Sequence, residues 1–89
     1  MSDALAQKLA ELARRFVDQA VNQSAAIRDA LQRGDKVELA TLAHKLAGNA
    51  GMLGFPDVGE AALEVEERID EGADPREATE RLLGLLSTL

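Results

Sequence analysis

The sequence lacks most of the residues that build metal centres and covalent cross-links. Its 89 residues include no cysteine, one histidine, two phenylalanines, and neither tryptophan nor tyrosine. Without cysteine the chain forms no disulfide and no cysteine-ligated zinc site, and a single histidine argues against a structural metal site. Because chains below about 100 residues bury only a thin core, stability has to come from packing, from a bound partner, or from both.

Basic residues are in the minority, with 10 lysines and arginines against 16 aspartates and glutamates and a net charge of −6. A phosphate backbone would be repelled, so nucleic-acid binding is not expected. No apolar run approaches the roughly 18–20 residues of a membrane span, so no membrane association is expected. The start, Met1 to Ala4, has no basic stretch followed by an apolar one. We therefore expect no secretory signal and a cytoplasmic protein.

Alanine and leucine dominate what is present, at 16 and 14 residues, whereas valine and isoleucine together number seven. This composition favours helix over strand. Apolar residues recur at steps of three and four, which predicts four amphipathic helices over about 3–32, 35–53, 56–71 and 75–88. Because the links between them are short, the sequence predicts an all-α, antiparallel up-down-up-down four-helix bundle, with one domain over residues 1–89.

Turn and capping residues mark the helix boundaries. Gly34 stands where a left-handed residue would end the first segment, and Asp35 with Glu38 has the spacing of a capping box for the second. Asn22 to Ser24 interrupt the apolar stripe of the first segment. That segment is therefore predicted either as one bent helix or as two helices.

The only histidine, His44, lies in the second predicted helix. At about 100° per residue, one face of this helix collects apolar side chains, namely Leu39, Leu42, Ala43, Leu46, Ala50 and Leu53. His44 lies about 140° from the centre of that face, so its imidazole is expected to face solvent. Thr41, Gly48 and Gly51 share this outer side.

The glycines near His44 have two interpretations. A glycine inside a helix costs roughly 1 kcal/mol relative to alanine, and Gly48 lies one turn after His44, where a side chain would neighbour the imidazole. Its absence favours clearance for the backbone of another protein. The alternative is an ordinary solvated histidine, with Gly51 serving close helix packing. The periodicity leaves both interpretations open.

The segment from Ala43 to Phe55, AHKLAGNAGMLGF, resembles the signature of histidine-containing phosphotransfer (HPt) domains. That signature has an apolar residue two positions after the histidine, a glycine four positions after it, and Leu-Gly about ten positions after it. Residues 30–35 resemble the lead-in of the family, and residues 61–66 resemble its third helix. The resemblance covers the chain from about Phe16 onward.

This resemblance implies a phosphoryl carrier in a multistep, two-component phosphorelay. His44 would be the phosphorylated nucleophile, attacking through Nε2, and Glu66 on the third helix would orient Nδ1. A solvated surface acid is the alternative for Glu66, and Asp70 has weaker support. Thr41, Lys45, Gly48 and Gly51 would form the partner-binding surface around His44. Phe55 and Met52 are expected to serve packing.

The resemblance also implies what surrounds the chemistry. The partners would be receiver domains of response regulators, a hybrid histidine kinase, or both, and Mg²⁺ would be supplied by the receiver. The chain has no nucleotide-binding loop, so it is expected to bind no cofactor or metal of its own, not to use ATP and not to phosphorylate itself. The phosphoryl carrier is expected to be a monomer.

The sequence departs from the family pattern three residues after the histidine, where the usual lysine is replaced by Ala47. Lys45 is the candidate contact for the phosphoryl group, provided that its long side chain bends back towards His44. The departure keeps a second function open, a non-catalytic docking adaptor or inhibitor that binds a receiver or a histidine kinase. A third possible function is that of a helical oligomerisation domain, in which the first segment would form the contact between copies.

Overall fold

A computed structural model describes residues 3–89, so Met1 and Ser2, part of the stretch inspected for a signal, lie outside the described residues. These residues form five helices, α1 (Asp3–Asp18), α2 (Ala20–Arg33), α3 (Lys36–Ala50), α4 (Pro56–Asp70) and α5 (Arg76–Leu86). Within this range there is no β-strand. The all-α prediction is confirmed, and the predicted count of four helices is corrected to five.

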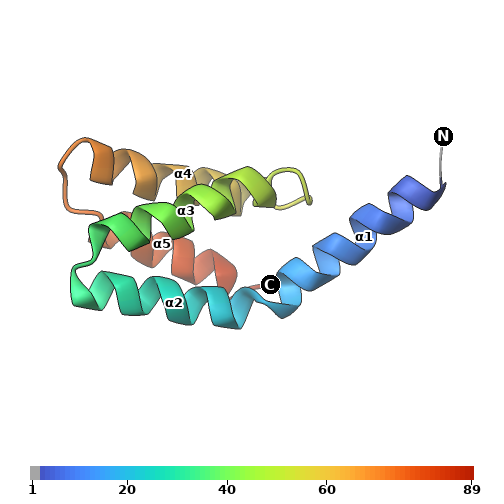
Figure 1. Cartoon of the computed structure of the whole chain (residues 1–89), viewed down its shortest axis with the longest axis horizontal. Coiled ribbons are helices and arrows are strands. Elements are labelled where there is room, and N and C mark those ends of the chain that lie inside the picture. The colour runs from blue at the N-terminus through green and yellow to red at the C-terminus, as the bar shows by residue number, and fades with distance from the viewer. Residues whose placement is uncertain (1–2) are drawn as a thin grey trace.

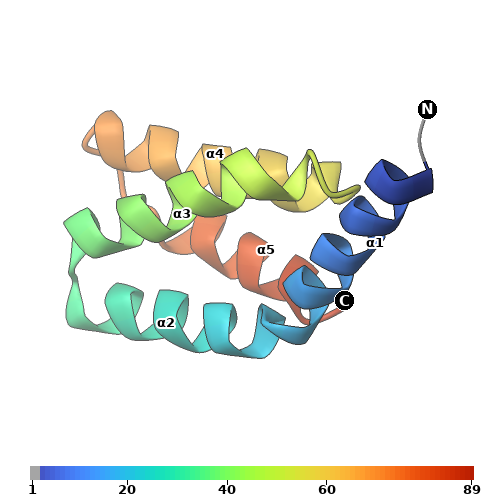
Figure 2. The ribbon, with the colours of Figure 1, turned by 45° about the vertical axis from the view of Figure 1, so that its right-hand side comes forward.

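The additional helix comes from the first predicted segment, 3–32, which divides at Gln19 into α1 and α2. Figure 1 shows α1 leaving the line of α2 and projecting from the rest of the molecule, and Figure 2 shows the same change of direction from another side. The molecule is accordingly elongated, measuring 45 × 22 × 19 Å. The last turn of α1 is held by Phe16, whose ring stacks on that of Phe55 with centroids 5.1 Å apart.

The helices α2 to α5 run in alternating directions in both views (Figures 1 and 2). Their buried residues join with Phe16 in one apolar core, and seven of its fifteen members are alanines. Alanine occupies little volume, so the helices approach closely around the few large side chains, such as Ile27, Leu39 and Leu82, which are fully buried. This packing is the main source of stability for a domain of this size.

Capping explains where α2 ends and α3 begins. Gly34 has a left-handed backbone, with φ of 69°, and its N–H closes the C-terminus of α2. Asp35 is the N-cap of α3, and its Oδ1 accepts a hydrogen bond of 3.0 Å from the backbone N–H of Glu38. Both predicted boundaries are confirmed here, and they fix the start of the helix that carries His44.

The other three predicted helices are shorter in the structure than in the prediction. The segment 35–53 is helical only to Ala50, because Gly51 to Gly54 form a turn in which Gly54 has φ of 95°. The segments 56–71 and 75–88 are helical over 56–70 and 76–86. The turn from Gly51 to Gly54 reverses the chain, so that α4 packs along α3.

The helices α3 and α4 meet most closely at Gly59. A Cβ atom added at Gly59 would lie 3.4 Å from the backbone nitrogen of Gly51, 3.6 Å from the carbonyl oxygen of Ala47 and 3.8 Å from Cβ of Ala50. One added methyl group would thus just fill the space, and a longer side chain would separate the helices. The spacing of α3 and α4, which carry His44 and Glu66, is therefore set by backbone contact.

No helix in the described part of the chain, residues 3–89, is long and apolar enough to cross a membrane.

Candidate functional site

The imidazole of His44 stands out from the middle of α3. Its side chain is 76% exposed, although α3 lies within the bundle. The opposite face of the helix is buried through Leu39, Ala43, Leu46 and Ala50. The periodicity therefore predicted the orientation of this helix correctly, and the ring is open to an approaching molecule.

Glu66 lies beside the ring, on the neighbouring helix α4. The distance between Oε2 of Glu66 and Nδ1 of His44 is 2.8 Å, and the carboxylate side chain is only 23% exposed. A carboxylate accepts hydrogen bonds and does not donate them, so this contact favours the tautomer with the proton on Nδ1. In that tautomer Nε2 carries a free lone pair.

The second ring nitrogen, Nε2, has no hydrogen-bond partner among residues 3–89. Since Nδ1 is the atom that faces Glu66, Nε2 is the ring nitrogen left for an external electrophile. The arrangement combines an oriented ring, a carboxylate next to the position where positive charge would develop, and an unoccupied nucleophilic lone pair. This is the geometry that a nucleophilic histidine needs.

The residues before and after His44 on the outer side of α3 have small side chains or none. Gly48 and Gly51 are exposed, and a Cβ added at either would meet nothing within 4 Å. No internal contact within the described residues therefore requires a glycine at these positions. Thr41 is exposed as well, and its hydroxyl donates to the carbonyl of Val37 at 3.0 Å, which keeps its oxygen close to the helix. On this side of α3 the neighbours of His44 are therefore one small polar side chain and two glycines.

The side chain of Lys45 lies on a different side of α3. It is exposed and lines a depression together with Arg15 and Asn49, on the side of α3 that faces α1 and α2, whereas Glu66 approaches from α4. Ala47, where the family pattern has lysine, is half-buried and packs against the core. Among the described residues the ion pair of His44 is with the carboxylate of Glu66, and no hydrogen bond joins Lys45 to the ring.

Two features of the site could not be found by reasoning from its motif. Gly59 fixes the close approach of α3 and α4, and its only signal was a glycine within the predicted third helix. Val37 and Leu63 are large apolar side chains that are 79% and 48% exposed. Val37 lies on α3, seven residues before His44, and Leu63 lies on α4, three residues before Glu66.

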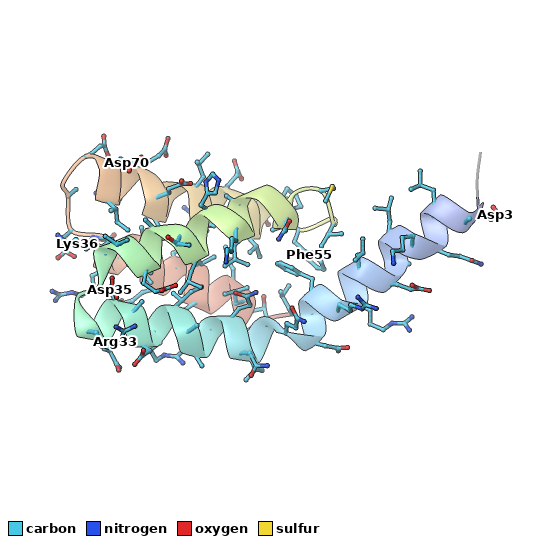
Figure 3. All side chains as sticks on the ribbon, viewed as in Figure 1. Asp3, Arg33, Asp35, Lys36, Phe55 and Asp70 are labelled. Carbon is cyan, nitrogen blue, oxygen red and sulfur yellow. The ribbon has the colours of Figure 1, made fainter. Side chains whose placement is uncertain are left out.

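Phe55 and Asp70 lie apart from the ring. Figure 3 places Phe55 at the turn between α3 and α4, with its side chain towards α1, and Asp70 at the far end of α4. Phe55 stacks on Phe16 and therefore serves packing, as expected. The same expectation for Met52 is wrong, because its side chain is 66% exposed. No contact joins Asp70 to the ring among residues 3–89.

The family model that describes the Hpt domain matches residues 11–89, most of the chain. The chain therefore belongs to the Hpt domain family, as the resemblance indicated. No curated protein and no solved structure matches it. Membership of this family supports a phosphotransfer role in phosphorelay signalling, in which Hpt domains interact with receiver domains and kinases.

Proposed function

We propose that the chain is a phosphoryl carrier that accepts a phosphoryl group on His44 from an aspartyl phosphate of one receiver domain and passes it to an aspartate of another. The observation that carries this proposal is the exposed imidazole whose Nδ1 lies 2.8 Å from Glu66. Family membership over residues 11–89 supports the same reaction class.

The transfer balances without an added base. The Nε2 lone pair of the neutral imidazole attacks phosphorus, a phosphorus–nitrogen bond forms, and the bond from phosphorus to the aspartate oxygen breaks, so that the aspartate leaves as a carboxylate. The proton on Nδ1 stays in place. The ring becomes a phosphorylated cation, and the carboxylate of Glu66 stabilises its positive charge. Transfer to the second receiver is the same step in reverse.

The carrier leaves the remaining charge neutralisation to its partner. Phosphoryl transfer depends mainly on positioning and on neutralising the oxygens of the transferred group. We propose that the receiver supplies the Mg²⁺ that neutralises these oxygens, and that this chain binds no cofactor. Lys45 is the nearest cation along α3, and contact with the phosphoryl group requires its side chain to bend back across the helix. Thr41, Gly48 and Gly51 leave the partner room to approach.

The test is transfer from labelled receivers. Purified receiver domains of the source organism are phosphorylated with labelled phosphate and mixed with the chain, and the label on the chain is tested for loss in acid and survival in base, the pattern of phosphohistidine. We expect labelling of the wild type and none of His44→Gln. Because the ring is largely exposed, His44→Gln should keep its circular dichroism spectrum. Labelling of His44→Gln, or no transfer from any receiver, contradicts the proposal.

A second candidate function, a docking adaptor or inhibitor without phosphoryl transfer, is favoured by one observation, the half-buried Ala47 in place of the family lysine. It predicts that a receiver or histidine kinase binds the chain equally well after His44→Ala, and that no label is transferred. The proposal of a carrier includes the expectations of a cytoplasmic, monomeric protein without autokinase activity.

A further inference from the structure

Gly59 differs from the other glycines of the chain in what surrounds it. All seven glycines lie within the described residues, and an added Cβ would meet nothing within 4 Å at six of them. At Gly59 it would lie 3.4 Å from the backbone nitrogen of Gly51 and 3.6 Å from the carbonyl oxygen of Ala47. Ala47 follows His44 by three residues, so this buried glycine of α4 meets the backbone of α3 about one turn from the ring.

The contact at Gly59 and the contact at the ring have the same register. Gly51 follows His44 by seven residues on α3, and Glu66 follows Gly59 by seven residues on α4. Because the two helices run in opposite directions (Figures 1 and 2), these residues form two matched pairs, Gly51 with Gly59 and His44 with Glu66. Seven residues turn a helix by about 700°, or two turns less about 20°, so both pairs lie along one side of each helix. The backbone contact and the carboxylate–imidazole contact therefore belong to one line of contact between α3 and α4, about 10 Å apart.

A side chain larger than alanine at position 59 has no room unless the helices move apart. The atoms nearest to the added Cβ are backbone atoms of α3, which cannot rotate away as the end of a flexible side chain can. The distance between Oε2 of Glu66 and Nδ1 of His44 is 2.8 Å, and a contact lengthened by about 1 Å is no longer a hydrogen bond. The side chain of Glu66 is only 23% exposed, so its neighbours restrict how far the carboxylate can follow the ring.

We propose that Gly59 is a positioning residue for phosphoryl transfer, because its lack of a side chain lets α4 approach α3 closely enough for Glu66 to hold the proton of His44 on Nδ1. Gly59 is buried and acts through Glu66. With the proton held on Nδ1, Nε2 keeps its lone pair free before any partner arrives. The effect on transfer rests on the proposed function, whereas the position of Glu66 is a property of the free chain.

The experiment begins with the free chain, in which ¹⁵N NMR of His44 reports which ring nitrogen carries the proton. It compares the wild type with Gly59→Ala, Gly59→Val and Gly59→Leu. Gly84→Leu is the matched control, because it makes the same change inside a helix at a glycine where an added Cβ meets nothing within 4 Å. Circular dichroism shows whether each variant is folded, and Gly59→Val, the smaller intrusion, carries the test if Gly59→Leu does not fold.

We expect the proton on Nδ1 in the wild type, Gly59→Ala and Gly84→Leu, and a mixture of tautomers in Gly59→Val and Gly59→Leu. Alanine keeps the wild-type arrangement because its methyl group just fills the space. With a receiver that labels the wild type, Gly59→Val and Gly59→Leu should slow transfer roughly 10-fold, the usual cost of losing a group that orients a functional histidine. The double variant Gly59→Val/Glu66→Gln should be no slower than Glu66→Gln alone, since both changes remove the same contact.

The outcomes separate this proposal from the carrier function. If folded Gly59→Val and Gly59→Leu keep the proton on Nδ1, or if Gly84→Leu loses it too, Gly59 does not position Glu66, and transfer to the wild type still supports the carrier. Losses of rate that multiply in the double variant overturn the proposal as well, because Gly59 would then act independently of Glu66. If the larger side chains shift the tautomer but no receiver labels the wild type, Gly59 does place Glu66, and its role in transfer falls with the carrier function.

Discussion

Replacing Gly48 by alanine should make the protein more stable and the carrier slower. Gly48 is the third residue from the end of α3, and Gly84 is the third residue from the end of α5. Both are exposed, and a Cβ added at either would meet nothing within 4 Å. Gly84→Ala is therefore a matched control, in which the same substitution is made in the same helical context but on a helix that does not carry His44.

The gain in stability follows from the backbone alone, since the added methyl group contacts nothing in the described structure. Glycine is less favourable than alanine inside a helix by about 0.5–1 kcal/mol. We expect each variant to gain roughly this free energy of unfolding. For a domain of this length that corresponds to a rise in Tm of about 4–8 °C per kcal/mol.

The loss of function is expected only at Gly48. Residues four apart on a helix are neighbours, so the new methyl group lies beside the imidazole of His44 and keeps the receiver from its closest approach. A displacement of about 1 Å between reacting groups costs up to about 100-fold in rate. We therefore expect Gly48→Ala to slow transfer about 10-fold, Gly48→Gln to slow it further, and Gly84→Ala to transfer at the wild-type rate.

The assay pairs thermal unfolding, followed by circular dichroism, with rapid-quench measurement of transfer from a labelled receiver. Wild-type transfer by Gly48→Gln would refute the idea that this position provides clearance. An equal loss of rate in Gly48→Ala and Gly84→Ala would also refute it, because the effect would then come from helix stability. A fall in Tm for Gly48→Ala would show that the space around Gly48 is not open.

Three further predictions concern the orientation of the ring and the stability of the bundle. Glu66→Gln removes the carboxylate charge beside Nδ1, which by the proposed function would stabilise the phosphorylated ring. This variant should therefore slow transfer about 10-fold or more, whereas Glu67→Gln, at the adjacent exposed acid, should not. ¹⁵N NMR of His44 should show the proton on Nδ1 in the wild type and a mixture of tautomers in Glu66→Gln. Asp35→Ala removes the side-chain cap of α3 and should lower the free energy of unfolding by about 1 kcal/mol, measured by urea denaturation; no loss would mean that water caps the helix equally well. Leu82→Ala opens a cavity at a fully buried position and should cost about 2–5 kcal/mol, seen as a lower urea midpoint; a cost below 1 kcal/mol would show that the core closes around the gap.

Local signals in the sequence were enough for the helical class and for the side of α3 that carries His44. The apolar repeat depends on the 3.6-residue period of a helix, and the buried residues of α3 follow it. The cap of α3 was also predictable, because Asp35 and Glu38 interact within one turn. In each case the interacting groups lie close together in the sequence.

The features that escaped prediction depend on residues far apart in the sequence. The break between α1 and α2 goes with the stacking of Phe16 on Phe55, which no periodicity relates. The contact of Gly59 with α3 likewise arises only when α4 has folded back. The position of Glu66 came from the family resemblance, with a solvated acid as the alternative, and the structure places its carboxylate 2.8 Å from the ring. Its role in catalysis stays a prediction.

At Gly59, α4 lies so close to the backbone of Ala47 and Gly51 that a single added methyl group would fill the space between them. Loading the exposed ring with phosphate is therefore expected to leave the spacing of these two helices unchanged, because the ring lies outside their contact. An empty carrier and a loaded one would present nearly the same outline to every protein they meet. Donor and acceptor would then have to tell the two apart by the phosphoryl group itself, through its volume and its negative charge.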